Sequence, residues 1–115
     1  MNETDHQKLR NEWLAEDSEL GLWEIVGDLR GLYPQMEADE FRTLTIQMIR
    51  PLLEQGVLHA VDLLPEGKVR YWKCTTEETL ERIENEWRLL DQDPNIGDIV
   101  WFLSDKFIEK YDPKQ

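Results

Sequence analysis

The sequence predicts an α+β fold, a mostly helical single domain with a small antiparallel sheet made of a hairpin over 57–73 and a strand over 98–103. Three observations lead to this prediction. Apolar residues recur at helical spacing over much of the chain, a Pro-Glu-Gly-Lys turn separates two strand-like runs, and a β-branched and aromatic run follows the last long helix. A length of 115 residues fits one domain, 1–115, around one core.

The first third of the chain predicts two helices. We expect residues 1–4 to be frayed and 5–15 to form a short helix with one apolar edge. A second helix is expected over 20–32, where apolar residues again follow helical spacing. Asp17 or Ser18 is the predicted N-cap, because such side chains accept hydrogen bonds from the free N–H groups of a first turn.

The clearest helical pattern covers about 39–55. Its apolar side chains form one stripe that is expected to face the core. The stripe consists of Phe41, Leu44, Thr45, Met48, Ile49, Leu52 and Leu53. Gly56 follows at the position where a left-handed C-terminal cap is expected.

A hairpin is predicted next. The runs 57–64 and 69–73 are strand-like, and residues 65–68 between them have the composition of a turn. Thr75 and Glu78 then have the spacing of a capping box that opens a further helix.

That helix is expected over 76–91, with Leu80, Ile83, Trp87 and Leu90 facing inward. The run 99–102 is predicted to be a strand that joins the hairpin. A short helix over 104–111, with Phe107, Ile108 and Tyr111 inward, is expected to close the domain.

The charge is strongly acidic and unevenly distributed. The formal net charge is -12, with an excess of acidic residues over 1–36 and 74–115 and near neutrality over 37–73. Such a field repels nucleic acid and anionic lipid at long range and attracts basic partners. The same charge also serves solubility alone, and the composition does not separate these two roles.

Other sequence signals exclude several classes of protein. Cys74 is the single cysteine, so no internal disulfide framework exists. There is no secretory signal pattern, and the apolar run 99–103 is far shorter than the roughly 20 residues of a membrane span. We therefore expect a cytoplasmic protein without a membrane role.

Catalytic, metal and cofactor motifs are not found, so we expect no enzyme. Cys74, His6 and His59 are the candidates for nucleophilic chemistry, but no nucleophile-elbow or cysteine-protease pattern surrounds them. The segment 91–98 alternates acids in the manner of a calcium loop, yet Phe102 stands at the twelfth position where a bidentate glutamate belongs. The expected cofactors and metals are none.

Three helices followed by a hairpin also match the element order of a winged-helix domain. Its DNA contacts would come from Arg42, Arg50, Lys68 and Arg70. Two bases against two acids on the third helix neutralise few phosphates, so direct nucleic-acid binding is the weaker alternative.

A more direct hypothesis is a partner-binding surface on the acid-rich second half. Its acidic members are expected around the helix 76–91 and the loop after it, with two hairpin aromatics as anchors. The predicted partner-binding residues are Glu77, Glu81, Glu84, Asp91, Asp93, Asp98, Tyr71 and Trp72. Such a surface suits a basic protein, or mimics a nucleic-acid backbone.

Residues 45–102 resemble small uncharacterised bacterial proteins that are similar to immunity proteins of polymorphic or contact-dependent toxin systems. The segments that carry this resemblance are Ile49–Gly56, Glu81–Trp87 and Asp93–Phe102. The resemblance implies a toxin-neutralising protein that occludes a cognate, basic toxin domain. The alternatives are a winged-helix transcription regulator and an acidic nucleic-acid mimic, and the oligomeric state stays open.

Overall fold

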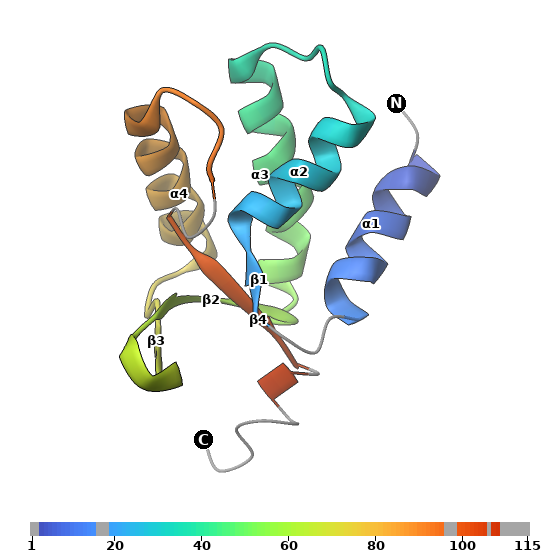
Figure 1. Ribbon diagram of the computed structural model, residues 1–115. Helices are drawn as coiled ribbons and strands as arrows, with labels where there is room; N and C mark the ends of the chain where they lie inside the picture. Colours follow the sequence, from blue (N-terminus) through green and yellow to red (C-terminus); the bar gives the residue numbers. More distant parts are fainter. Residues whose placement is uncertain (1–2, 16–18, 96–98, 106, 109–115) are drawn as a thin grey trace.

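The computed structural model describes residues 3–15, 19–95, 99–105 and 107–108 and shows an α+β fold with a four-stranded antiparallel sheet (Figure 1). The elements in chain order are α1 (Glu3–Ala15), β1 (Leu20–Gly21), α2 (Leu22–Leu32), α3 (Ala38–Glu54), β2 (Leu58–Leu63), the 3₁₀ turn η1 (Pro65–Gly67), β3 (Val69–Tyr71), α4 (Thr76–Leu90) and β4 (Trp101–Ser104). The predicted fold class is therefore confirmed.

The sheet has the order β1-β4-β2-β3, so the last strand in the chain is an inner strand. Phe102 pairs with Leu20 of β1 on one side and with Ala60 of β2 on the other. The hairpin pairs Val61 with Tyr71. The four long helices stand on one side of this sheet, with α1 and α4 at opposite flanks of α2 and α3 (Figure 1).

The core lies between these helices and the sheet, and it confirms the predicted apolar stripes. Of the stripe on α3, Leu53 is half-buried and the other six residues are buried. On α4 the expected Leu80, Ile83 and Trp87 are buried, while Leu90 is half-buried. From the sheet, Leu58 and Phe102 join the same cluster.

Local end signals also shape the helices. Thr75 and Glu78 form the predicted capping box, with Thr75 Oγ1 accepting from Glu78 N at 3.1 Å and Glu78 Oε1 accepting from Thr75 N at 2.9 Å. Gly56 follows α3 with φ +72°, the left-handed conformation that glycine adopts without strain. These two predictions rest on residues close in sequence, and both are confirmed.

Several predicted boundaries were wrong. α1 begins at Glu3, inside the segment expected to be frayed. The N-cap of α2 is Gly21, whose N–H donates to Glu24 Oε2 at 2.9 Å, and Gly21 also belongs to the unpredicted strand β1. Asp17 and Ser18 lie outside the described residues.

At the other end, Ser104 belongs to β4 and does not start the last helix. Asp105, Phe107 and Ile108 are helical, whereas Tyr111 lies outside the described residues. β4 begins at Trp101, later than the predicted strand over 98–103. The hairpin strand β3 ends at Tyr71, so Trp72 and Lys73 lie beyond the strand to which they were assigned.

The winged-helix element order is present, since three helices precede the hairpin. Two further elements are added to that arrangement. β4 lies between β1 and β2, and α4 packs against α3, the helix that would read DNA. Across the described part of the chain, no helix is long and apolar enough to cross a membrane.

Candidate functional site

The acidic residues of α4 divide into those with a basic partner and those without one. Glu84 accepts from Arg88 at 2.7 Å, one turn along the same helix. Glu86 accepts from Arg82 at 2.8 Å. These pairs follow from the helical spacing of four residues and neutralise part of the predicted acidic face.

Glu77 faces α3 and is also engaged. Its carboxylate pairs with Arg50 of α3, which in turn lies 3.6 Å from Glu54. The hydrogen bond from Arg50 lowers the pKa of the Glu77 carboxyl below its ordinary value, and the opposite charge acts in the same direction. Glu77 therefore ties α4 to α3.

Glu81 and Asp91 have exposed side chains and no hydrogen bond or ion pair with any other described side chain. Asp91 terminates α4 in a left-handed conformation with φ 57°, and its backbone N–H donates to the carbonyl of Arg88. Its carboxylate is thus carried beyond the last helical turn. Among the described acidic residues predicted to bind a partner, these two are the ones whose carboxylates a partner can meet without breaking an internal pair.

Asp93 is held at the end of α2 by Arg30. The guanidinium Nε donates to Asp93 Oδ2 at 3.0 Å, and its Nη1 donates to the carbonyls of Tyr33 at 3.1 Å and Met36 at 2.7 Å. The same guanidinium lies 3.8 Å from the centroid of the Phe41 ring. Arg30 therefore fixes the loop after α4 against the ends of α2 and α3.

A hollow of about 680 Å³ lies where α2 ends, α3 begins and α4 ends. Its wall consists of Arg30, Ala38, Asp39, Arg42, Trp87, Arg88, Asp91, Gln92 and Asp93. The structure thus brings Asp91 and Asp93 together at one depression. Of the three arginines in this wall, Arg42 and Arg88 pair within their own helices, whereas the partner of Arg30, Asp93, lies 63 positions away and could not be found from sequence.

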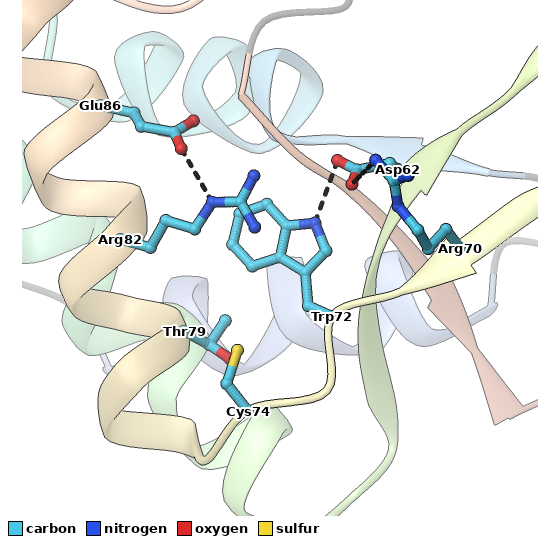
Figure 2. A network of polar contacts seen from close by, with 7 residues as sticks. All are labelled: Asp62, Arg70, Trp72, Cys74, Thr79, Arg82 and Glu86. Atoms are coloured by element: carbon cyan, nitrogen blue, oxygen red, sulfur yellow. Dashed lines mark hydrogen bonds and ion pairs between the residues drawn. The ribbon is translucent and has the colours of Figure 1, made fainter.

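The predicted hairpin anchors are half-buried, not exposed. Trp72 donates its indole N–H to Asp62 Oδ1 at 3.0 Å, and the Arg82 guanidinium covers its ring at 3.7 Å from the centroid (Figure 2). Asp62 also accepts from Arg70 at 3.2 Å. Trp72 therefore connects the hairpin to α4 and is not a free anchor.

Tyr71 packs edge-on against His59, with ring centroids 6.4 Å apart. Its position on the hairpin sets it apart from the hollow at the end of α4. Asp98, the last of the predicted partner-binding residues, lies outside the described residues. The structure thus brings Asp91 and Asp93 to one hollow, whereas Glu81 lies in the first half of α4 and does not line it, and the two aromatics are used elsewhere.

Three of the four cations in the winged-helix hypothesis are engaged by carboxylates. The pairs join Arg42 to Asp39, Arg50 to Glu54 and Glu77, and Arg70 to Asp62. The Arg42 side chain is only 11% exposed. Few positive charges on α3 and the hairpin are therefore available to bind phosphates.

The nucleophile candidates are engaged by other side chains. His6 lies in α1, within the helix predicted over 5–15: it is buried, and its Nε2 lies 2.7 Å from the Tyr33 hydroxyl. Cys74 and His59 line one small cavity of about 160 Å³. The thiol of Cys74 pairs with the Thr79 hydroxyl at 3.3 Å, whereas His59 pairs with Asp105 at 2.7 Å.

The described residues contain no group of three or more histidine, cysteine or acidic side chains arranged to hold a metal ion. Asp91 and Asp93, which begin the calcium-like stretch, are used by the end of α4 and by Arg30. Comparison of the chain with protein-family models, with curated proteins and with solved structures found no match.

Proposed function

We propose that this protein is an immunity-type binding protein, which neutralises a toxin by occluding a basic domain of it with the acidic surface at the end of α4. The term "α4 surface" denotes here Glu81 on α4, Asp91 at the end of that helix and the hollow that Asp91 lines. In this proposal the protein acts without catalysis. It acts in the cytoplasm, where such an antidote meets its toxin.

One observation supports this proposal above the others. Each arginine of α2, α3, the hairpin and α4 is paired with a carboxylate, yet Glu81 and Asp91 remain unpaired among the described residues. Glu37 and Glu40, at the start of α3, are also exposed and carry no ion pair there. This end of the molecule therefore presents negative charge to any partner.

The negative charge acts first on the rate at which a partner associates. A field from a net charge of -12 attracts a basic domain and raises its association rate on the order of tenfold or more at low salt. The hollow, whose wall has three aspartates and three arginines, then offers a concave surface for a protruding side chain of the partner. The resemblance of residues 45–102 to immunity proteins agrees with this mode of action.

The test combines partner capture with matched charge reversals. The tagged protein is used to capture its partner from a nuclease-treated lysate, and the association rate of that partner is then measured by surface plasmon resonance. Glu81→Lys with Asp91→Lys should lower the rate about tenfold, because the variant field repels the basic domain. The effect should shrink near 0.5 M salt, where the screening length falls to roughly 4 Å.

The control variant carries Glu19→Lys with Glu66→Lys. These side chains are also exposed and without an ion pair among the described residues, and the variant has the same net charge. It should keep most of the association rate. Equal losses in both variants would reduce the effect to net charge alone and would remove the α4 surface as the specific site.

The winged-helix regulator stays a second candidate, because the order of three helices and a hairpin is observed. A labelled duplex of mixed sequence at low salt distinguishes it. We expect no binding, since the relevant arginines are already engaged. Tight, salt-sensitive binding would replace our proposal, and capture of a DNA-binding host protein would favour the nucleic-acid mimic.

A further inference from the structure

The side of the sheet that faces away from the helices carries apolar side chains. Leu20, Ala60 and Phe102 point into the core between the sheet and the helices. Because side chains alternate along a strand, their neighbours Val61 and Trp101 point to the opposite side. The four long helices all stand on the core side of the sheet (Figure 1). The opposite side is therefore a surface that these helices do not cover.

The apolar residues on that side form what we call the outer sheet face. It consists of Trp23, Val61, Leu63, Val69, Tyr71, Trp101 and Leu103. Trp23 reaches this face from α2, because a Cβ at Gly21 would lie 2.5 Å from the Trp23 ring and 3.3 Å from the Trp101 ring. None of the seven residues belongs to the main core or packs against it. They are a separate apolar cluster.

The hairpin directs its polar pair inward and its apolar pairs outward. Asp62 and Arg70 pair at 3.2 Å on the side of the helices. The next pair along the hairpin, Leu63 with Val69, lies on the outer sheet face. An antiparallel sheet with one side in water normally shows the reverse, with polar residues outward. A contiguous apolar surface of this kind marks a site of protein interaction.

One copy of the chain covers the outer sheet face only in part. Val61 and Leu103, in the middle strands, are buried. Around them Trp23, Val69, Tyr71 and Trp101 are half-buried, and Leu63 is 38% exposed. The face therefore has a closed centre and an apolar border that stays in contact with water.

The charge of this face decides the kind of partner. The sequence as a whole is 33% charged, yet among the described strand residues on this side only His59 carries an acidic or basic group, and it pairs with Asp105 at 2.7 Å. Such a face suits an uncharged apolar surface, since charged residues are depleted in the centre of interfaces. A second copy of the chain presents one. A two-fold axis places the two faces together without setting like charges opposite each other.

The area of the face agrees with contact between two copies. Strands about 4.8 Å apart and residues about 3.3 Å apart make a four-stranded face roughly 19 Å wide and up to about 20 Å long. Two such faces bury roughly 1,000 Å² together, which lies at the low end for specific interfaces and is typical of weak dimers.

We propose that the outer sheet face binds the same face of a second copy of this chain and forms a two-fold dimer. The two sheets then stack about 10 Å apart, with their helices on the outside. The α4 surface lies on the helix side of the sheet, so it stays accessible in both copies. The dimer and the toxin-binding proposal can therefore each fail without the other.

Sedimentation velocity of the intact chain tests the dimer. Between about 10 µM and 1 mM, the mass should rise from 13.7 kDa toward twice that value. Raising sodium chloride to about 0.5 M should strengthen the dimer about two- to tenfold, because it screens the repulsion between two copies of charge -12. A constant mass of 13.7 kDa would overturn the proposal and leave the face to an apolar partner of another kind. A dimer that weakens with salt would be held by ion pairs and would also overturn it.

Matched leucine variants locate the contact. Leu63→Lys places a charge on the outer sheet face and should weaken the dimer at least about tenfold. Leu32→Lys makes the same change at a leucine of α2 that is equally exposed, at 38%, and it should dimerise normally. Leu89→Lys, at the 85% exposed leucine of α4, should also dimerise normally. Loss of the dimer in Leu89→Lys, with none in Leu63→Lys, would move the contact to α4.

The indole N–H signals in a ¹⁵N NMR spectrum give a second measurement that needs no change to the face. They are assigned with single Trp→Phe variants and followed as the protein is diluted. The signals of Trp23 and Trp101 should shift with concentration, since both rings lie on the outer sheet face. The signals of Trp72 and Trp87, which lie in or against the main core, should stay in place. Shifts confined to the second pair would contradict the proposed contact.

Discussion

Gly21 shows how a single residue is fixed by the side chains around it. It pairs with Trp101 in the sheet and caps α2 through its N–H. A Cβ at this position would lie 2.5 Å from atoms of the Trp23 ring and 3.3 Å from the Trp101 ring. The junction of β1 and α2 therefore needs a residue without a side chain.

Gly21→Ala should accordingly lower the free energy of unfolding by about 1–3 kcal/mol, because two indole rings must move. Gly27→Ala is the matched control: its Cβ meets nothing, and alanine should stabilise the helix interior by about 0.5–1 kcal/mol. Urea unfolding followed by circular dichroism measures both. Opposite signs for the two variants are expected, and a neutral Gly21→Ala would contradict the crowding.

Individual residues also show which features of the site were accessible from sequence. The pairing of Glu84 with Arg88 follows from the helical spacing of four residues, which the sequence alone shows. The pairing of Arg30 with Asp93 joins positions 63 apart, and the burial of His6 depends on its contact with Tyr33. No local sequence pattern predicts either feature. Polar residues whose partners are distant in sequence can only be placed by the fold.

At the scale of elements, the hairpin and α4 are joined by the stack of Arg82 on Trp72 (Figure 2). Asp62 accepts from the indole N–H, and Glu86 accepts from the guanidinium, so both members of the stack are also oriented by hydrogen bonds. This arrangement explains why Trp72 is half-buried although it lies beyond the end of β3.

A double-mutant cycle measures that junction. Trp72→Leu and Arg82→Met should each destabilise the protein, and the coupling energy between them should be about 0.5–1 kcal/mol, the size of a cation–π contact near the surface. Urea unfolding of the two single variants and the double variant provides the cycle. Strict additivity would show that Arg82 only covers the ring without binding it.

The elements themselves differ in how far sequence predicts them. α3 and α4 carry long apolar stripes and local caps, so their existence and inward faces were predicted. β1 has two residues and exists only because β4 lies beside it. Its formation depends on a strand partner from the far part of the chain, which leaves no local signal.

At the scale of the whole molecule, a net charge of -12 makes self-repulsion a term in stability. Sodium chloride screens this repulsion more than it weakens the short internal pairs. Raising the sodium chloride concentration from a low value to about 0.5 M should therefore raise the melting temperature by roughly 2–5 °C. Thermal unfolding by circular dichroism at two salt concentrations measures the shift. A fall would mean that the internal ion pairs outweigh the repulsion.

The inner position of β4 has a consequence for how the chain folds. The sheet pairs residue 21 with residue 101 and residue 58 with residue 104, so neither β1 nor the hairpin has its inner neighbour until residues 101–104 are in place. During synthesis, the three helices and the hairpin emerge from the ribosome well before that strand. Loop closure over such a separation slows folding. The nascent chain is thus expected to wait as a helical intermediate with an open strand edge, and to complete its sheet only when the last strand is free.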